Sequence, residues 1–186
     1  MIYPIYSYGF PLLKKRAEAI EKEGETDVKK LSQDMFETMY AAAGVGLAGP
    51  QIGLSKRIFV VDASPMDEES LKDFKKVFIN PQKIEETGDE WPFEEGCLSI
   101  PNIREDVYRP ERIKLRYFDE DWNEHEEVFE GMAARVIQHE YDHLEGILFT
   151  DHLSPFKKRL LKGKLSGISK GKAKHDYRMK FPLLKK

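Results

Sequence analysis

The segment Met132–Glu145 reads MAARVIQHEYDHLE and contains the pattern His-Glu-x-x-His. Apolar residues recur along it at helical spacing and a glycine stands just beyond its end, so we predict a helix over 132–145. Residues four apart lie on one face of a helix, so His139 and His143 can present both imidazoles to one metal ion. Glu140 would lie beside that ion, poorly placed as a ligand but able to handle a proton from water.

Met132 and Val136 share the helical face of the two histidines, so both imidazoles are expected to point into the interior. A buried polar group without a partner is costly, and a metal ion is one remedy. The alternative is a pair of core histidines that hydrogen-bond to backbone or carboxylate groups, with Glu140 at the surface. The five-residue pattern alone leaves both interpretations open.

A catalytic metal site of this type needs a third protein ligand. One candidate is Cys97, in the segment Glu95–Pro101 (EGCLSIP), because a thiolate suits a borderline-soft metal. A lone cysteine is, however, more often a small buried hydrophobic residue. In zinc peptidases that carry this pattern the third ligand usually lies C-terminal to it. The candidates on that side are Glu145, Asp151 and His152.

The composition excludes several classes of protein. With 186 residues and 40% hydrophobic content, the chain is expected to form one domain with a tail. Its single cysteine excludes an intrachain disulfide scaffold. No apolar run approaches the roughly 20 residues that span a bilayer, and the N-terminal residues lack the basic start of a signal peptide. We therefore expect a soluble, cytoplasmic protein with neither a membrane nor DNA as its partner.

The charges are distributed unevenly along the chain. Residues 155–186 contain twelve Lys and Arg against one acidic residue, Asp176, whereas the whole chain has a formal net charge of −3. This asymmetry predicts a catalytic domain over 1–154 and a basic helix and tail over 155–186, the helix beginning at Ser154-Pro155. The basic segment is either a solvated terminal helix or a contact for an anionic partner such as RNA.

The remaining local signals predict an α+β fold. β-Branched and aromatic residues dominate short segments between residues 76 and 130, with a hairpin over 118–129. Strands and helices do not alternate regularly, which argues against a parallel α/β sheet. We therefore expect antiparallel β-sheets packed around helix 132–145, with additional N-terminal helices. The other predicted elements are a helix over 11–20, a helix over 28–43 capped by Asp27 and ended by Gly44, a strand over 57–62 and an edge strand over 177–184.

Three segments, taken together, resemble the three motifs of peptide deformylases. They are Gly44–Gln51 (GVGLAGPQ), Glu95–Ser99 (EGCLS) and Gln138–Leu144 (QHEYDHL), in the family's order and approximate spacing. The resemblance extends over residues 6–156. One departure is Gly49, where family members usually have alanine.

The resemblance implies a metal site and its ligands. Cys97, His139 and His143 match the three protein ligands of one divalent cation, with water as the fourth ligand. The family's metal is typically Fe²⁺, often replaced by Zn²⁺, Ni²⁺ or Co²⁺, and the sequence does not choose among them. Glu140 matches the general base and acid.

The resemblance also implies the reaction. Peptide deformylases remove the formyl group from the N-terminal formylmethionine of newly synthesised polypeptides and release formate. Gln51 matches the side-chain amide that binds the developing oxyanion together with the backbone N–H of Leu98. Gly46 matches a backbone position that hydrogen-bonds the substrate, and the glycine-rich loop could receive the substrate as an added strand.

The surroundings of the metal helix suggest a substrate pocket. The residues expected to line the pocket for the methionine side chain are Val45, Met132, Arg135 and Val136. Arg135 is unusual for an apolar pocket, and we expect its guanidinium to reach water. Arg104 falls where family members place a basic residue toward the peptide. Glu95 is expected to pair with Arg109 behind Cys97 and to support the metal ligands.

The basic segment 155–186 suggests a further partner. In some bacterial deformylases a basic C-terminal helix docks on the ribosome near the nascent-chain exit, and rRNA phosphates attract Lys and Arg. The residues also leave two other functions open. One is a zinc endopeptidase built on the same helix, and the other is a non-catalytic binder of ribosomes or RNA with a structural metal.

Overall fold

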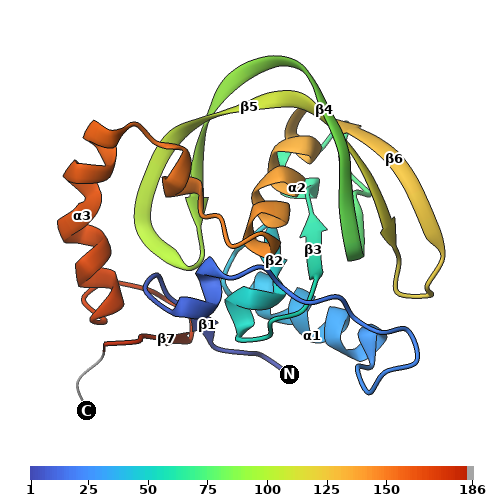
Figure 1. Cartoon of the computed structure of the whole chain (residues 1–186), viewed down its shortest axis with the longest axis horizontal. Helices are drawn as coiled ribbons and strands as arrows, with labels where there is room; N and C mark the ends of the chain where they lie inside the picture. Colours follow the sequence, from blue (N-terminus) through green and yellow to red (C-terminus); the bar gives the residue numbers. More distant parts are fainter. Residues whose placement is uncertain (184–186) are drawn as a thin grey trace.

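The computed structural model describes residues 1–183, and its main feature is a five-stranded antiparallel sheet that curves around one helix (Figure 1). The helix is α2 (Gly131–Leu144), which agrees with the prediction over 132–145. The predicted α+β architecture is confirmed. The strands, in their order across the sheet, are β2 (Gly46–Ala48), β3 (Ile58–Asp62), β4 (Lys75–Cys97), β5 (Ile100–Phe118) and β6 (Glu124–Glu130).

Strands β4 and β5 are long and form a hairpin that arches over α2 (Figure 1). Their pairing register shifts at several points, among them the step between Ile79 and Gln82 and the step between Gly96 and Cys97. Such bulges bend and twist a strand pair, so the hairpin can curve around the helix. The predicted hairpin over 118–129 is formed by the end of β5 and by β6.

Helix α2 forms the centre of the main hydrophobic core. Ala134, Ile137 and Leu144 on the helix belong to the same buried cluster as Phe59 and Phe78 of the sheet. Full burial of a large apolar side chain stabilises the fold by about 1.5–3 kcal/mol. These contacts fix the helix inside the sheet, and they carry its two histidines into the interior.

The predicted helix over 11–20 is wrong. Only Pro11–Lys14 form a short 3₁₀ helix, η1, and the chain then runs extended. The backbone N–H of Ala17 donates a hydrogen bond to the carbonyl oxygen of Leu144, at 2.8 Å. A backbone group that bonds to a distant segment cannot also make a helical hydrogen bond, so the tertiary contact overrides the local helical spacing.

The second predicted helix is confirmed as α1 (Val28–Ala41), and the Asp27 side chain accepts a hydrogen bond from a backbone N–H in its first turn. The residue with positive φ after the helix is Ala43, at 53°, and not Gly44 as predicted. Gly44 instead allows a close approach, since a Cβ there would lie 2.8 Å from Cδ1 of Leu98. The glycine-rich segment that follows contains strand β2 and a 3₁₀ helix, η2 (Gly49–Ile52).

The C-terminal part packs on the body of the molecule. Helix α3 (Pro155–Ser169) begins where the sequence predicts, and Leu161, Leu165 and Ile168 join a core cluster with residues of β5. Beyond it, β7 (Met179–Lys180) pairs in parallel with β1 (Ile5–Tyr6). The remaining short elements are the 3₁₀ helices η3 (Ser64–Met66) and η4 (Phe149–His152).

The C-terminal strand differs from its prediction. The expected strand over 177–184 is reduced to the two residues of β7, because Pro182 has no N–H to offer a partner; residue 184 lies outside the described part of the chain. The division between residues 154 and 155 stays a prediction. Among residues 1–183, no helix combines the length and the apolar character that crossing a membrane requires.

Candidate metal centre

Three potential metal ligands meet where the end of β4 faces α2. One ligand atom each from Cys97, His139 and His143 lies within 4.8 Å of the other two. The Cys97 Sγ is 3.4 Å from Nε2 of His143. Residues separated by more than forty positions in the sequence are thus brought to one point, as the resemblance implies.

The downstream candidates for a third ligand lie elsewhere and have partners of their own. Glu145 Oε1 accepts a hydrogen bond from Nη2 of Arg57 at 2.6 Å. Asp151 pairs with Lys14. His152 bonds to Asp142 rather than lying beside the two motif histidines. The geometry therefore favours the thiolate over the ligand set of a zinc endopeptidase.

A buried carboxylate fixes the orientation of His139. Glu95 Oε2 lies 3.2 Å from Nδ1 of His139, which leaves Nε2 of that ring for a cation. Arg109 donates to both oxygens of Glu95, at 2.7 and 3.1 Å, so the predicted Glu95–Arg109 pair is confirmed. Burial alone would raise the pKa of Glu95, but the hydrogen bonds from His139 and Arg109 outweigh it and hold the pKa well below its usual range.

The same arginine extends the network to a residue that the sequence analysis missed. Arg109 Nη1 donates to Asp142 Oδ2 at 2.8 Å, and His152 Nε2 bonds to the same oxygen at 2.7 Å. Asp142 stands directly before His143, on the buried side of α2. A charged residue inside an otherwise buried helical motif is the signal that could have predicted a distant cationic partner.

The electrostatics of His143 suit metal ligation. Burial and the neighbouring His139 hold the pKa of His143 well below its usual value, so its imidazole is neutral and able to ligate. Within residues 1–183, Nδ1 of His143 and Oε2 of Glu140 are buried without a hydrogen-bond partner. One thiolate and two imidazoles form a donor set that fits a divalent cation such as Fe²⁺ or Zn²⁺.

Glu140 is buried on α2 and lines the same cleft as Cys97 and His139. Its pKa is raised to about 7, mainly because burial disfavours the charged carboxylate. It lies against Gly46 of the edge strand β2, where an added Cβ would come within 2.4 Å of Oε1 of Glu140. The glycine is therefore needed for the close approach of backbone and carboxylate.

Gln51 is held beside the sulfur of Cys97. Its side chain is 1% exposed, and its Nε2 lies 3.5 Å from the Cys97 Sγ and 3.3 Å from Oγ of Ser99. Its Oε1 accepts a hydrogen bond from the N–H of Ala48 at 2.9 Å, which orients the amide so that the NH₂ group faces the site. An oriented, buried amide donor is what an oxyanion needs.

A cleft of about 760 Å³ opens above these residues. Of the residues predicted to bind substrate, five line the cleft and Met132 does not. The five are Val45, Gly46, Arg104, Arg135 and Val136. Phe93 and Leu98 of the hairpin also line the cleft. Residues 174–177 of the C-terminal part line it as well, although the sequence did not predict a contribution from them.

Arg135 does not reach water, contrary to the prediction. The residue is 2% exposed, and its guanidinium donates to the carbonyl oxygens of Val107 and Trp91 at 2.8 and 2.6 Å. It also donates to Glu95 at 3.2 Å and lies 4.4 Å from the Trp91 ring centroid. The Arg135 guanidinium is thus bonded to two backbone carbonyls and one carboxylate, and not to water as predicted.

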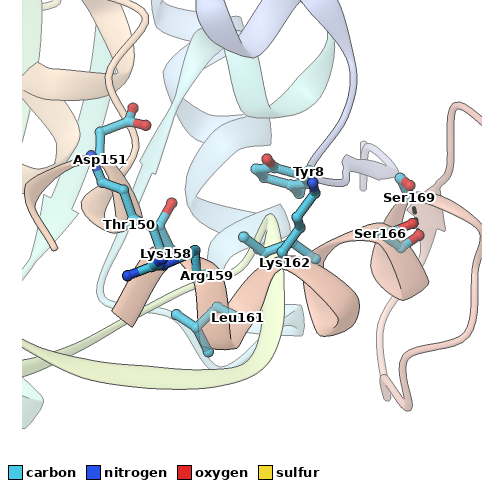
Figure 2. Close-up of a pocket in the computed structure, with 10 residues that line it drawn as sticks. Tyr8, Thr150, Asp151, Lys158, Arg159, Leu161, Lys162, Ser166 and Ser169 are labelled. Atoms are coloured by element: carbon cyan, nitrogen blue, oxygen red, sulfur yellow. Dashed lines mark hydrogen bonds between the residues drawn. The ribbon is translucent and has the colours of Figure 1, made fainter. Parts of the chain in front are cut away.

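A second hollow, of about 520 Å³, lies beside α3 and away from the motif residues. Figure 2 shows Lys158, Arg159 and Lys162 along the helix, with Tyr8, Thr150 and Asp151 also lining the hollow. Cys97, His139 and His143 are not among its lining residues. It is therefore a separate feature of the basic C-terminal part.

Comparison with known proteins agrees with the geometry of the site. The family model described as polypeptide deformylase matches residues 2–159. A peptide deformylase of Cytophaga hutchinsonii is 64% identical over 185 residues, covering 100% of both chains, and one of Christiangramia forsetii is 56% identical, covering 100% of this chain and 99% of the other. The crystal structure of peptide deformylase from Thermus thermophilus has 39% identity and a TM-score of 0.80, covering 90% of this chain and 97% of that one. The chain therefore belongs to the polypeptide deformylase family.

Proposed function

We propose that Cys97, His139 and His143 hold the cation at which this chain removes the formyl group from the N-terminal formylmethionine of nascent polypeptides, with release of formate. The observation that carries the proposal is the meeting of these three side chains beside a cleft whose lining includes Cys97, His139, Glu140 and Gln51. Since the substrate is a chain emerging from the ribosome, we place the activity in the cytoplasm.

The metal we propose is Fe²⁺, with Zn²⁺, Ni²⁺ or Co²⁺ as substitutes. When bound, such a cation lowers the pKa of water and polarises the carbonyl of the formyl group. A thiolate ligand cancels part of its charge, and the Glu95 carboxylate behind His139 makes that imidazole a stronger donor.

Glu140 moves the proton. Its carboxylate accepts a proton from the attacking water and passes it to the leaving amine, which becomes the free amino group of methionine. A pKa of about 7 suits both halves of this task, because the group can be charged or neutral near neutral pH. Glu140 lines the cleft, and its Oε2 has no hydrogen-bond partner among residues 1–183.

Gln51 and Leu98 stabilise the negative charge that develops on the formyl oxygen. Nε2 of Gln51 lies 3.5 Å from the Cys97 Sγ, and Leu98, the residue after Cys97, lines the same cleft. Loss of one such donor typically lowers the rate about 100- to 1000-fold. The substrate backbone would extend along the edge strand β2 at Gly46, as an added strand of the sheet.

The substrate's methionine side chain would enter the apolar part of the cleft between Val45 and Val136. Arg135 also lines the cleft, and its two NH₂ groups donate to Glu95 and to the backbone carbonyls of Val107 and Trp91. Arg104, paired with Glu94 at 2.9 Å, stands at the exposed rim where the peptide would leave the cleft.

A formate-release assay with a formyl-Met-Ala-Ser peptide tests the proposal. The wild-type protein should release formate in proportion to its metal content, and Cys97→Ala should lose both the metal and the activity. An endopeptidase that used Glu145 or His152 would keep its metal in this variant. Absence of formate release from metal-loaded wild-type protein would overturn the proposal. Anaerobic purification followed by metal analysis identifies the cation.

We further propose that the basic face of α3 contacts the ribosome. Lys158, Arg159 and Lys162 are exposed on this face and line the hollow of Figure 2. Clusters of Lys and Arg bind the phosphates of nucleic acids, and this binding weakens as the salt concentration rises. The double variant Lys158→Glu/Lys162→Glu should lose co-sedimentation with ribosomes at low salt. Lys72→Glu, an exposed charge reversal away from α3, is the control, and equal sedimentation of the two variants would refute this contact.

A further inference from the structure

The segment between α3 and β7 is anchored at both ends. Before it, Ile168 of α3 is buried in the core. After it, the N–H of Ile5 donates to the carbonyl of Arg178 at 2.8 Å, and the N–H of Ser7 donates to that of Lys180 at 3.0 Å. The family match ends at residue 159, so this segment lies beyond it.

Two hydrogen bonds hold the segment against the turn that carries Cys97. The Asn102 side-chain amide donates to the carbonyl of Lys174 at 2.8 Å, and Asn102 itself has a left-handed backbone, with φ at 64°. The Tyr177 hydroxyl donates to the carbonyl of Leu98 at 2.7 Å. Tyr177 and Leu98 also pack against the same hydrophobic cluster, so the contact is a packed one.

Leu98 is consequently fixed on both of its sides. On one side Cys97 belongs to the metal centre, and on the other the Leu98 carbonyl accepts the hydrogen bond from Tyr177. The Ser99 carbonyl is held as well, by the N–H of Tyr8 at 2.8 Å. The Leu98 N–H lies in the planar peptide unit that begins at Cys97, and the Leu98 carbonyl lies in the next unit. Anchors at Cys97 and at the Leu98 carbonyl therefore restrict rotation of both units about the Leu98 Cα.

The segment also forms part of the cleft wall. Lys174, His175, Asp176 and Tyr177 line the same cleft as His139 and Glu140. Asp176, the one acidic residue of the basic region 155–186, is exposed there. A peptide longer than its first residue would therefore run past these side chains as it leaves the site.

From this geometry we infer that residues 174–177 complete the active site. Tyr177 is a positioning residue that aims the Leu98 N–H at the formyl oxygen, and Lys174 and Asp176 contact the substrate beyond its methionine. The inference rests on the proposed deformylation and on the role of Leu98 in it. Residues 174–177, which lie outside the family match, would then influence both the rate of deformylation and the preference among substrates.

The test compares Tyr177→Phe with wild type on formyl-Met-Ala and on a formylated tetrapeptide. The hydroxyl acts through an interaction made in the transition state, so kcat should fall about two- to tenfold on both peptides, with KM changed less than twofold. Metal content and Tm should equal those of wild type. Tyr3→Phe is the control, since Tyr3 packs against the same cluster but lies outside the cleft lining, and it should keep full activity.

The double variant Lys174→Ala/Asp176→Ala tests whether this part of the cleft wall contacts the substrate. It should raise KM about two- to fivefold for the tetrapeptide and raise KM less for formyl-Met-Ala, which has only one residue beyond its methionine. Wild-type kcat in Tyr177→Phe, or a fall in kcat that merely follows metal loss, would overturn the positioning role. Equal KM changes on both peptides, or none, would overturn the contact with substrate. Wild-type protein that fails on both peptides would instead contradict the proposed deformylation.

Discussion

Helices α2 and α3 are of similar length, 14 and 15 residues, but they place their charged side chains in opposite environments. The buried polar or charged residues of α2 are Arg135, Gln138, Glu140, Asp142 and His143. The exposed charged residues of α3 include Lys158, Arg159, Lys162 and Lys164. A buried charge needs partners from other parts of the chain, whereas an exposed one is solvated where it stands.

The buried charges of α2 find their partners on the long hairpin of β4 and β5. Arg109 on β5 reaches both Glu95 on β4 and Asp142 on α2, and Arg135 reaches Glu95 from the helix itself. The network thus ties the helix to both arms of the long hairpin. Glu140 lies outside this network, and within the described part of the chain its Oε2 is buried without a hydrogen-bond partner.

The largest difference between the two helices is expected in catalysis. Glu140→Gln on α2 removes the proton acceptor and keeps the size of the side chain, so formate release should fall about 100- to 10,000-fold with metal still bound. Arg159→Gln on α3 should leave turnover within twofold of wild type. The measurement is formate release at matched metal content. An active Glu140→Gln protein would show that Glu140 is not the proton carrier.

The next difference concerns stability. Arg109→Met leaves Glu95 and Asp142 buried without their cationic partner, and we expect the free energy of unfolding to fall by about 3–5 kcal/mol. Arg116→Met removes an exposed pair with Glu126, and the free energy of unfolding should change much less than in Arg109→Met. Urea unfolding of the two variants checks the contrast. Equal losses would mean that the buried network contributes no more than a surface ion pair.

The buried network should also give the fold an acid sensitivity. The pKa of Glu95 is lowered in the folded protein from 4.5, so its stabilising effect is complete above that pH and is lost as the pH falls below it. Glu95→Gln should therefore lose about 1–3 kcal/mol less than wild type between pH 7 and pH 3. Urea unfolding with a chelator present measures this without a contribution from metal release. Parallel curves for the two proteins would contradict the expectation.

The comparison of helices also explains what the sequence could predict. Segment 132–145 has apolar spacing and a terminal glycine that agree with its tertiary role, and α2 was predicted to within one residue at each end. Segment 11–20 has helical spacing as well, but its backbone bonds to Leu144 and other distant residues. Local pattern predicts an element only where tertiary hydrogen bonds do not compete for the same backbone groups.

The site residues likewise fall into those that a local motif predicts and those whose contacts depend on the tertiary fold. The three ligand candidates, Glu140 and Gln51 could be named because each stands in a motif whose residue types have a defined chemistry. Arg135 was assigned the wrong environment, since its partners, Trp91 and Val107, are set by the curvature of the hairpin. Tyr177 carries no local signal, because its contact with Leu98 depends on where the chain returns after α3.

The smallest effect is expected from the exposed charges of α3. Lys158→Glu/Lys162→Glu should change the free energy of unfolding by no more than about 0.5 kcal/mol, since both side chains are solvated and the helix is held by Leu161, Leu165 and Ile168 on its other face. Leu165→Ala, as the matched change on that other face, should cost about 2–5 kcal/mol. Thermal unfolding of both variants decides the matter. A double charge reversal as damaging as the leucine truncation would show that α3, like α2, depends on its charges for folding, and the contrast between the two helices would then be lost.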